Sequence, residues 1–249
     1  MTEILHDRIP TDMTEPRALP GVRPLAPDEW LRVDEAYADQ MAHKRALIRD
    51  RLPQVHRMDP SAEPAAREVL EEALNLLPDM GYSRVGDVVR CPDGVQIDLN
   101  MGPPLVVLGH MMQADICLLE KRGDEHVLTG AILCFPASWD LGEKFLRPLV
   151  RIHRSVELYD GDVARRVQRL FDGVRVGSPL WRFNMLHYVD AELHQPRLEG
   201  APRKHPPEAT APFTRAERQC IVRLPKTDAV VFSIHTYVAR RSASDTSDQ

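Results

Sequence analysis

The sequence has few cysteines, and no two of them are closely spaced. Cys91, Cys117, Cys134 and Cys220 form no CxxC pair and no CxxCH string. A disulfide framework, a zinc ribbon and a cysteine-ligated iron–sulfur cluster are therefore not expected, and covalent haem attachment is excluded. Cys117 and Cys134 lie in apolar stretches, where a cysteine is usually an inert core residue rather than a nucleophile.

Other signatures are absent as well. The chain contains no GxGxxG, GxxxxGK[ST], HExxH or GxSxG string, which argues against a Rossmann dinucleotide site, a P-loop, a zinc protease and a hydrolase elbow. No apolar run reaches the length of a membrane span, and the N-terminus lacks the pattern of a secretory signal, so we expect a cytoplasmic protein. A basic surplus is also missing: 32 Lys and Arg stand against 37 Asp and Glu, giving a net charge of −5. We therefore expect no nucleic-acid partner.

The 249 residues, of which 43% are hydrophobic, are enough for one sizeable core. Residues 1–24 are rich in proline and predict an extended arm. Residues 25–239 form the expected domain, and the small polar residues 240–249 are typical of a disordered tail. The proline-rich stretch 194–212 predicts an excursion over the surface.

Hydrophobic periodicity predicts separate blocks of helices and hairpins. Helices are expected over 28–51, 63–77, 141–152 and 162–171, and a capping-box sequence at Thr214–Glu217 predicts a further short helix. Hairpins are expected from 85–90 with 95–99 and from 115–121 with 127–135, and longer strands over 180–189 and 229–238. The arrangement favours an α+β fold with an antiparallel sheet.

Ten histidines are present. Those expected to be solvated, because their surroundings are polar, are His6, His43, His56, His126, His194 and His205. Those in or beside apolar elements are His110, His153, His187 and His235. From composition alone, a histidine in such a place is more often a hydrogen-bonded core residue than a metal ligand. The spacing of His187 and His194 matches no standard metal site.

Several strings together carry a family resemblance. They are QADICLLEK (113–121), CFPASW (134–139), Glu143-Lys144, Ile152-His153, RFN (182–184), RAERQCIVRLP (215–225) and AVVFSIHTY (229–237). With them the chain resembles the haem-dependent oxidative N-demethylase α-subunit-like family from about Leu25 to Val238. The last two strings are the most specific.

The resemblance implies a haem b protein, with the haem held noncovalently, built on a PAS-like antiparallel sheet flanked by helices. The implied activity is oxidative demethylation of a small methylated amine with O2, giving the amine and formaldehyde. Electrons would come from NADPH through separate flavin and iron–sulfur components. This division agrees with a chain that has neither a dinucleotide fingerprint nor iron–sulfur cysteine spacing.

The resemblance also implies roles for particular residues. His153 is the leading candidate for the axial iron ligand, with His235 and His110 as alternatives. If it has only a structural role, His153 would instead hydrogen-bond a terminal carbonyl at a helix end. The cations expected to bind haem propionates are Arg218, Arg223, Arg182 and Lys144. Each could equally form a structural ion pair.

Asp115 could face an ammonium substrate or relay protons, or it could simply cap a turn at a strand end. The chain departs from the family pattern beside it, because Ala114 stands where an acidic residue is common. His235 stands where the family commonly has arginine, which changes the local electrostatics. A PAS-like haem or small-ligand sensor without turnover, and a haem-free scaffold, therefore remain alternatives to the enzyme.

Overall fold

A computed structural model describes residues 3–13, 21–152, 161–202 and 211–241. Its large antiparallel sheet has the strand order β1-β8-β9-β10-β6-β7-β2, and a second, three-stranded sheet has the order β3-β4-β5. The strands are β1 Arg23–Pro24, β2 His56–Met58, β3 Ser83–Val85, β4 Val88–Arg90, β5 Gln96–Asp98, β6 Asp115–Arg122, β7 Glu125–Ile132, β8 Leu180–Tyr188, β9 Phe213–Arg223 and β10 Val230–Arg240. The fold is α+β, as the sequence predicts.

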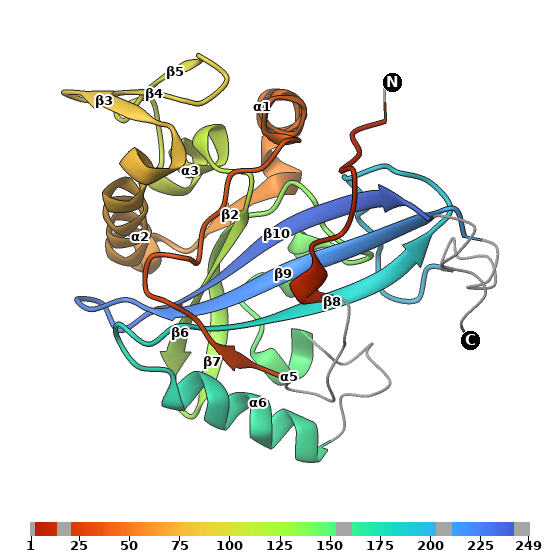
Figure 1. The fold of residues 1–249 in the computed structure, drawn as a ribbon. Helices are drawn as coiled ribbons and strands as arrows, with labels where there is room; N and C mark the ends of the chain where they lie inside the picture. The colour runs from red at the N-terminus through yellow and green to blue at the C-terminus, as the bar shows by residue number, and fades with distance from the viewer. Residues whose placement is uncertain (1–2, 14–20, 153–160, 203–210, 242–249) are drawn as a thin grey trace.

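Helices flank the large sheet (Figure 1). The α-helices are α1 Tyr37–Val55, α2 Glu63–Leu76, α3 Pro104–Met111, α4 Leu141–Lys144, α5 Leu149–Ile152 and α6 Gly161–Gly173, and the 3₁₀ helices are η1 Thr11–Met13, η2 Pro60–Ala62 and η3 Leu77–Met80. Within the described ranges no helix is both long enough and apolar enough to cross a membrane.

The two faces of the large sheet carry separate hydrophobic cores. The larger core joins one face to α1, α2 and α3, and Leu105, Ile116 and Val231 are among its fully buried members. The smaller core lies on the opposite face with α5 and α6, and it includes Leu119, Leu149 and Phe171. Side chains alternate between the two faces along each strand, so neighbouring residues of one strand belong to different cores.

The helix α3 lies close against the large sheet because Gly109 has no side chain. A Cβ atom at this position would come within 2.6 Å of Cγ1 of Ile132 on β7 and within 2.8 Å of Cδ1 of Ile48 on α1. Any larger residue would therefore push α3 away from both neighbours. The helix is buried on nearly all sides, so its sequence lacks the period of an amphipathic helix.

The N-terminal arm packs on the sheet. Met13 is fully buried in the larger core, and Arg23–Pro24 forms β1, which pairs with β8. The backbone N–H of His6 donates to the carbonyl of Val238 at the end of β10. In Figure 1 the arm runs across the face of β8, β9 and β10.

Two sequence predictions of helix are wrong. The capping-box sequence Thr214–Glu217 lies in β9, because β8 and β10 both pair with this segment and satisfy its backbone groups. The helix expected over 141–152 is two short helices, α4 and α5. Leu146 between them has a φ of 57° and Pro148 follows, and neither is compatible with a continuous helix.

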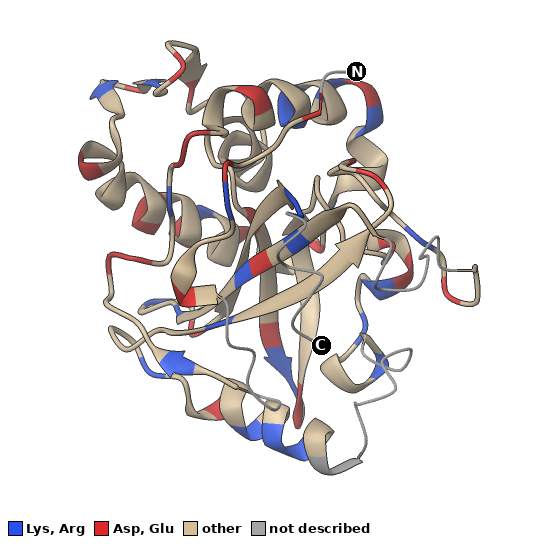
Figure 2. Ribbon diagram, turned by 45° about the vertical axis from the view of Figure 1, so that its right-hand side comes forward, with Lys and Arg blue, Asp and Glu red and all other residues tan. Residues whose placement is uncertain are grey.

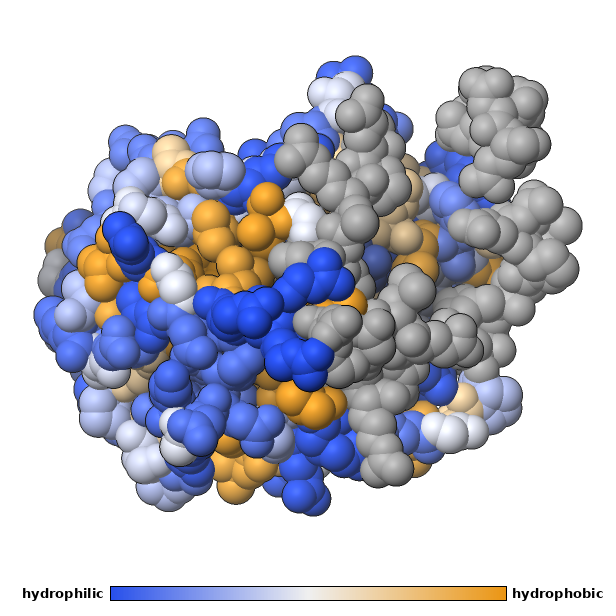
Figure 3. Space-filling view, turned by 90° about the horizontal axis from the view of Figure 1, so that it is seen from below, coloured by the Kyte–Doolittle hydropathy of each residue, from blue (hydrophilic) through white to orange (hydrophobic). Residues whose placement is uncertain are grey.

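Charged residues occur within strands of the large sheet as well as on the outer helices (Figure 2). The outer surface of α6 is basic, because Arg165, Arg166 and Arg169 are exposed there. Seen from below, the molecule is largely hydrophilic, with apolar patches between the polar residues (Figure 3). The charges inside the sheet are unusual and identify the candidate site.

Candidate functional site

The sheet face that packs on α5 and α6 is apolar at one end and polar at the other. Across the strands, one row consists of Leu180, Ile221, Phe232 and Cys117. The next row on the same face consists of Arg182, Gln219, Ile234 and Asp115, and the row after it of Asn184, Glu217 and Thr236. We call Arg182, Arg215, Glu217, Gln219 and Thr236 the polar cluster.

Glu217 is the acidic residue of the polar cluster. Only 6% of it is exposed, and burial raises the pKa of its carboxyl group, with the nearby charge of Asp115 acting in the same direction. Gln219 Nε2 donates to Glu217 Oε2 at 3.2 Å, and Arg215 Nη2 lies 3.5 Å from Glu217 Oε1. A buried carboxyl with a raised pKa can hold or release a proton closer to neutral pH than an exposed one.

The two arginines of the cluster have unused donors. Arg215 donates from Nη1 to the carbonyl of Leu193 at 2.9 Å and from Nη2 to that of Phe135 at 2.6 Å. Arg182 donates from Nη1 to Gln219 Oε1 at 2.6 Å, and burial lowers its pKa. The Nε atoms of both arginines are buried without a hydrogen-bond partner in the described part of the chain. Such donors fit an anionic or polar ligand.

Asp115 lies beside the polar cluster, but its carboxylate already has partners. The backbone N–H groups of Cys134 and Phe135 donate to its Oδ1 and Oδ2 at 3.0 and 2.7 Å. Lys44 Nζ lies 2.9 Å from Oδ1. The negative charge of Asp115 is therefore compensated within the protein, and its contacts support a positioning role rather than direct contact with a substrate.

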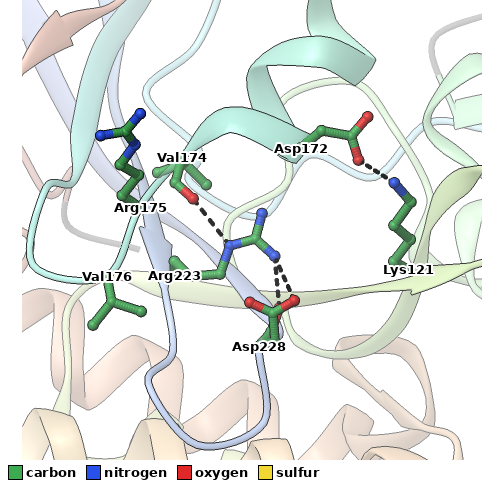
Figure 4. Close-up of a pocket in the computed structure, with 7 residues that line it drawn as sticks. All are labelled: Lys121, Asp172, Val174, Arg175, Val176, Arg223 and Asp228. Carbon is green, nitrogen blue, oxygen red and sulfur yellow. Dashed lines mark hydrogen bonds and ion pairs between the residues drawn. The ribbon is translucent and has the colours of Figure 1, made fainter.

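Arg223 lies toward the opposite end of the same face, four residues along β9 from Gln219 and thus about 13 Å from it. All three of its nitrogens have acceptors: Nε bonds the carbonyl of Val174 at 3.1 Å, Nη1 that of Asp228 at 2.8 Å, and Nη2 that of Phe171. Arg223 also borders a hollow of about 350 Å³ (Figure 4). The residues lining this hollow are Lys121, Asp172, Val174, Arg175, Val176, Arg223 and Asp228.

The structure does not bring the four predicted propionate-binding cations together. Lys144 is buried and pairs with Glu199, to which Arg151 also donates at 2.8 Å. Hydrogen bonds from Arg151 and Lys144 lower the pKa of Glu199 to about 2. Arg218 follows Glu217 in β9 and points to the opposite face of the sheet from Arg182 and Arg223, so one group cannot contact it together with them from one side.

The leading axial candidate, His153, lies outside the described residues. The alternative His235 is on the opposite face of the sheet from the polar cluster, where its Nε2 is 2.7 Å from Asp34 Oδ2. His110, the other alternative, is half-buried at the end of α3, and burial lowers its pKa. Among the described residues no group of three or more His, Cys, Asp and Glu side chains is arranged to hold a metal ion.

Two histidines expected to be solvated are buried. His6 is 4% exposed and His126 is 1% exposed. The Nδ1 of His126 lies 2.8 Å from Gln168 Nε2, its ring packs on Phe171, and its Nε2 has no hydrogen-bond partner within the described ranges. The polar sequence around His126 hides its burial, because the side chain of this strand residue is covered by α6, a distant part of the chain.

The comparison with known families gives a match. Residues 21–246 match the family described as "Haem-dependent oxidative N-demethylase, alpha subunit-like". The chain belongs to this family. The family name indicates haem dependence, and the residues of the polar cluster can be tested against that group.

The donor set fits a haem. The unused Nε atoms of Arg182 and Arg215 suit the negatively charged propionates, which prefer arginine or amide donors. On the same face, Trp139, Leu180 and Phe232 are partly buried against the smaller core and provide apolar surface suited to a porphyrin. This face therefore offers apolar surface for the porphyrin at one end and free arginine donors for the propionates at the other.

Sequence reasoning missed Glu217 and Arg215 as site residues. Both lie in the string RAERQCIVRLP, which carries the family resemblance, but the capping-box pattern predicts that they begin a short helix. The local sequence gives no clear signal for them, because Arg218 breaks the alternation of polar and apolar residues between Arg215 and Cys220. Their place in the sheet follows from the pairing of β9 with β8 and β10.

Proposed function

We propose that this chain is the haem b-containing oxygenase subunit of an oxidative N-demethylase. The observation that carries the proposal is the family match over residues 21–246, together with the buried carboxyl group of Glu217 among arginine donors on a partly apolar face. The overall reaction consumes the methylated amine, O2, two electrons and two protons. It gives the demethylated amine, formaldehyde and water.

The haem would be bound noncovalently between the sheet and the segment that includes α4, α5 and α6. The strand order β7-β6-β10-β9-β8, with these helices between β7 and β8 in the chain, supports the PAS-like arrangement. Arg182 and Arg215 would bind the propionates, and His153 would be the protein ligand of the iron. Haem iron supplies the oxidation of the N-methyl group when it is bound.

Glu217 is the residue we assign to the amine. A small ammonium ion needs a compensating negative charge when it leaves water, because an unpaired buried charge is costly. Asp115 is already compensated by Lys44 at 2.9 Å, whereas the contacts of Glu217 are a neutral amide donor, Gln219 at 3.2 Å, and a longer ion pair with Arg215 at 3.5 Å. In its charged form Glu217 would accept a hydrogen bond from the ammonium group. In its neutral form, which the raised pKa favours, it would hold a proton for oxygen reduction.

Electrons would reach this subunit from outside. The chain has no dinucleotide fingerprint and no iron–sulfur cysteine spacing. NADPH oxidation would therefore take place on a separate reductase with flavin and iron–sulfur components. The partners of this chain are then a small amine, O2 and that reductase.

Absorption spectroscopy of the freshly purified protein tests haem binding, and acid–acetone extraction tests that the haem is noncovalent. Reduced protein with O2 and a methylated amine is expected to release formaldehyde in proportion to the amine consumed. A protein that is colourless and takes up no added haemin would overturn the proposal. A haem spectrum that shifts with amines, but no formaldehyde, would favour the sensor.

Two variants separate the roles of the carboxyl groups. Glu217→Gln is expected to keep its haem and to lose turnover by at least tenfold, because the side chain no longer carries a charge or a transferable proton. Asp115→Asn is expected to lower turnover in proportion to a loss of folded or haem-loaded protein. If Asp115→Asn alone lost turnover at full haem content, Asp115 would be the catalytic carboxylate.

A further inference from the structure

Arg218 is a buried cation with an unused edge. Only 1% of the residue is exposed, and it lies on the sheet face opposite the polar cluster. Its Nη1 is 2.9 Å from Cys220 Sγ, and its guanidinium carbon is 5.4 Å from the centre of the Trp181 ring. Its Nε and Nη2 atoms have no hydrogen-bond partner within the part of the chain that the structure describes.

Nε and Nη2, the two atoms without a partner, lie on the same edge of the planar guanidinium group. The N–H bonds of Nε and Nη2 run parallel and form the edge that binds two oxygens of a carboxylate or phosphate group. A sulfur atom and an aromatic face, which are the other neighbours of this side chain, do not neutralise a cation as an oxyanion does. A buried arginine in such surroundings is costly without a counter-ion.

The nearby carboxylates are used elsewhere. Asp34 Oδ2 is bonded by His235 at 2.7 Å and by His6 at 3.1 Å, and Asp34 Oδ1 accepts from Gln113 Nε2 at 2.7 Å. Asp12 Oδ2 lies 3.6 Å from Nη2 of Arg32. Among the described residues no carboxylate lies within ion-pair distance of Arg218.

Other cations and donors surround this edge. Burial lowers the pKa of Arg218, and the charge of Arg32 acts in the same direction, whereas Cys220, Tyr237 and Asp12 act to raise it. The guanidinium carbon of Arg23 also lies 5.4 Å from the Trp181 ring. His235 is the direct cross-strand neighbour of Arg218, and its Nδ1 is buried with no partner in the described ranges.

We propose that Arg218 is the centre of a binding site for a small oxyanion, a carboxylate or phosphate group that presents two oxygens to the Nε–Nη2 edge. The site lies on the sheet face crossed by the N-terminal arm (Figure 1). Arg32 adds positive charge there, and Asp12, which pairs with Arg32, partly offsets it. The anion supplies the charge that the described side chains do not. Because the site faces away from the polar cluster, it does not depend on the proposed haem function.

The test is a titration of the purified full chain, dialysed into a buffer without phosphate or carboxylates, with inorganic phosphate and, separately, with acetate. Calorimetry and thermal unfolding are expected to show saturable binding of at least one of the two, and which one binds identifies the source. Ion chromatography of the denatured protein detects an anion that has co-purified. No saturable binding of either anion, and no co-purified anion, would overturn the proposal.

Matched variants locate the site. Arg218→Lys keeps the charge but loses the two-donor edge, and it is expected to weaken the binding at least tenfold. Arg218→Met is expected to abolish it and to unfold at the same temperature as, or higher than, the anion-free wild type. Arg223→Met, on the other face, is expected to lose stability but to bind the anion as the wild type does. Unchanged binding in both Arg218 variants contradicts the proposal.

A last arm tests whether the oxyanion is instead a haem propionate. The same titration is repeated on protein that has been loaded with haemin. Unchanged anion affinity supports a separate site. Loss of anion binding on haem loading would overturn it, because the edge would then be occupied by the propionate itself.

Discussion

Lys44 and Asp115 form an ion pair with 2.9 Å between Nζ and Oδ1, and neither side chain is more than 1% exposed. The same Nζ donates to the carbonyls of Met112, Gln113 and Ala114, the three residues that precede Asp115. One lysine of α1 thus fixes the backbone where β6 begins. It also neutralises the carboxylate nearest to the polar cluster.

The first prediction concerns this pair. Lys44→Met is expected to lower the free energy of unfolding by about 3–5 kcal/mol, because it leaves the Asp115 charge buried and unpaired. The double variant Lys44→Met/Asp115→Asn is expected to lose less than the sum of the single losses, by about 1–3 kcal/mol. Urea unfolding of the four proteins measures this coupling. Additive losses would show that the two side chains do not act as a pair.

The second prediction is a pH dependence at Glu217. Burial raises its pKa in the folded state, so the folded protein binds more protons than the unfolded protein above the ordinary glutamate value of about 4.3. Its contribution to stability is therefore present at low pH and is lost as pH rises through the folded pKa. The Tm of Glu217→Gln relative to wild type is expected to increase from pH 5 to pH 8. The exposed Glu35→Gln serves as the control and should show no such trend.

The third prediction concerns Asp34. Burial acts to raise the pKa of Asp34, but hydrogen bonds from His235 and His6 outweigh it and hold this pKa far below the ordinary value. The resulting stability is present above about pH 4 and is lost as pH falls toward the folded pKa. Asp34→Asn is expected to cost about 2 kcal/mol at pH 7, a deficit that shrinks below pH 4. Asp39→Asn, at an exposed position of α1, should change stability by less than about 0.5 kcal/mol.

The fourth prediction separates two histidines as axial ligands. His153→Ala is expected to lose haem or to shift its Soret band, because the iron loses its protein donor. His126→Ala is the matched control, since His126 is buried beside α6 and is held by Gln168 through Nδ1, while its Nε2 has no partner among the residues that the structure describes. A changed Soret band in the His126 variant and an unchanged band in the His153 variant would move the axial bond to His126.

The sequence predicts those elements whose side chains follow a simple period. The hairpin of β6 and β7 and the strands β8 and β10 lie where alternation of apolar residues places them, and Gly94, with a φ of 83°, forms the turn expected between β4 and β5. The sequence does not predict β9, because the buried residues of this strand include the charged Arg215, Glu217 and Arg218. Their burial depends on strands on both sides, and the local sequence does not contain that information.

The site was predictable only in part, for a related reason. The family strings identify Arg182 and Asp115, but they do not show which polar atoms already have partners. Asp115 is satisfied by Lys44, which is far away in the chain, and by two backbone N–H groups of a different strand end. Such pairings follow from tertiary structure alone, and they determine which carboxyl group is available for chemistry.

Glu217 and Arg218 are consecutive residues of β9 and point to opposite faces of the sheet. The register of β9 therefore determines the position of both the polar cluster and the proposed oxyanion site. Because side chains alternate, a shift of one residue against β8 and β10 would turn Arg218 toward α5 and α6, and Glu217 toward the face crossed by the N-terminal arm. An insertion or deletion of one residue near the turn between β9 and β10 would thus invert both sites at once. We expect length changes in this hairpin to be tolerated far less than substitutions.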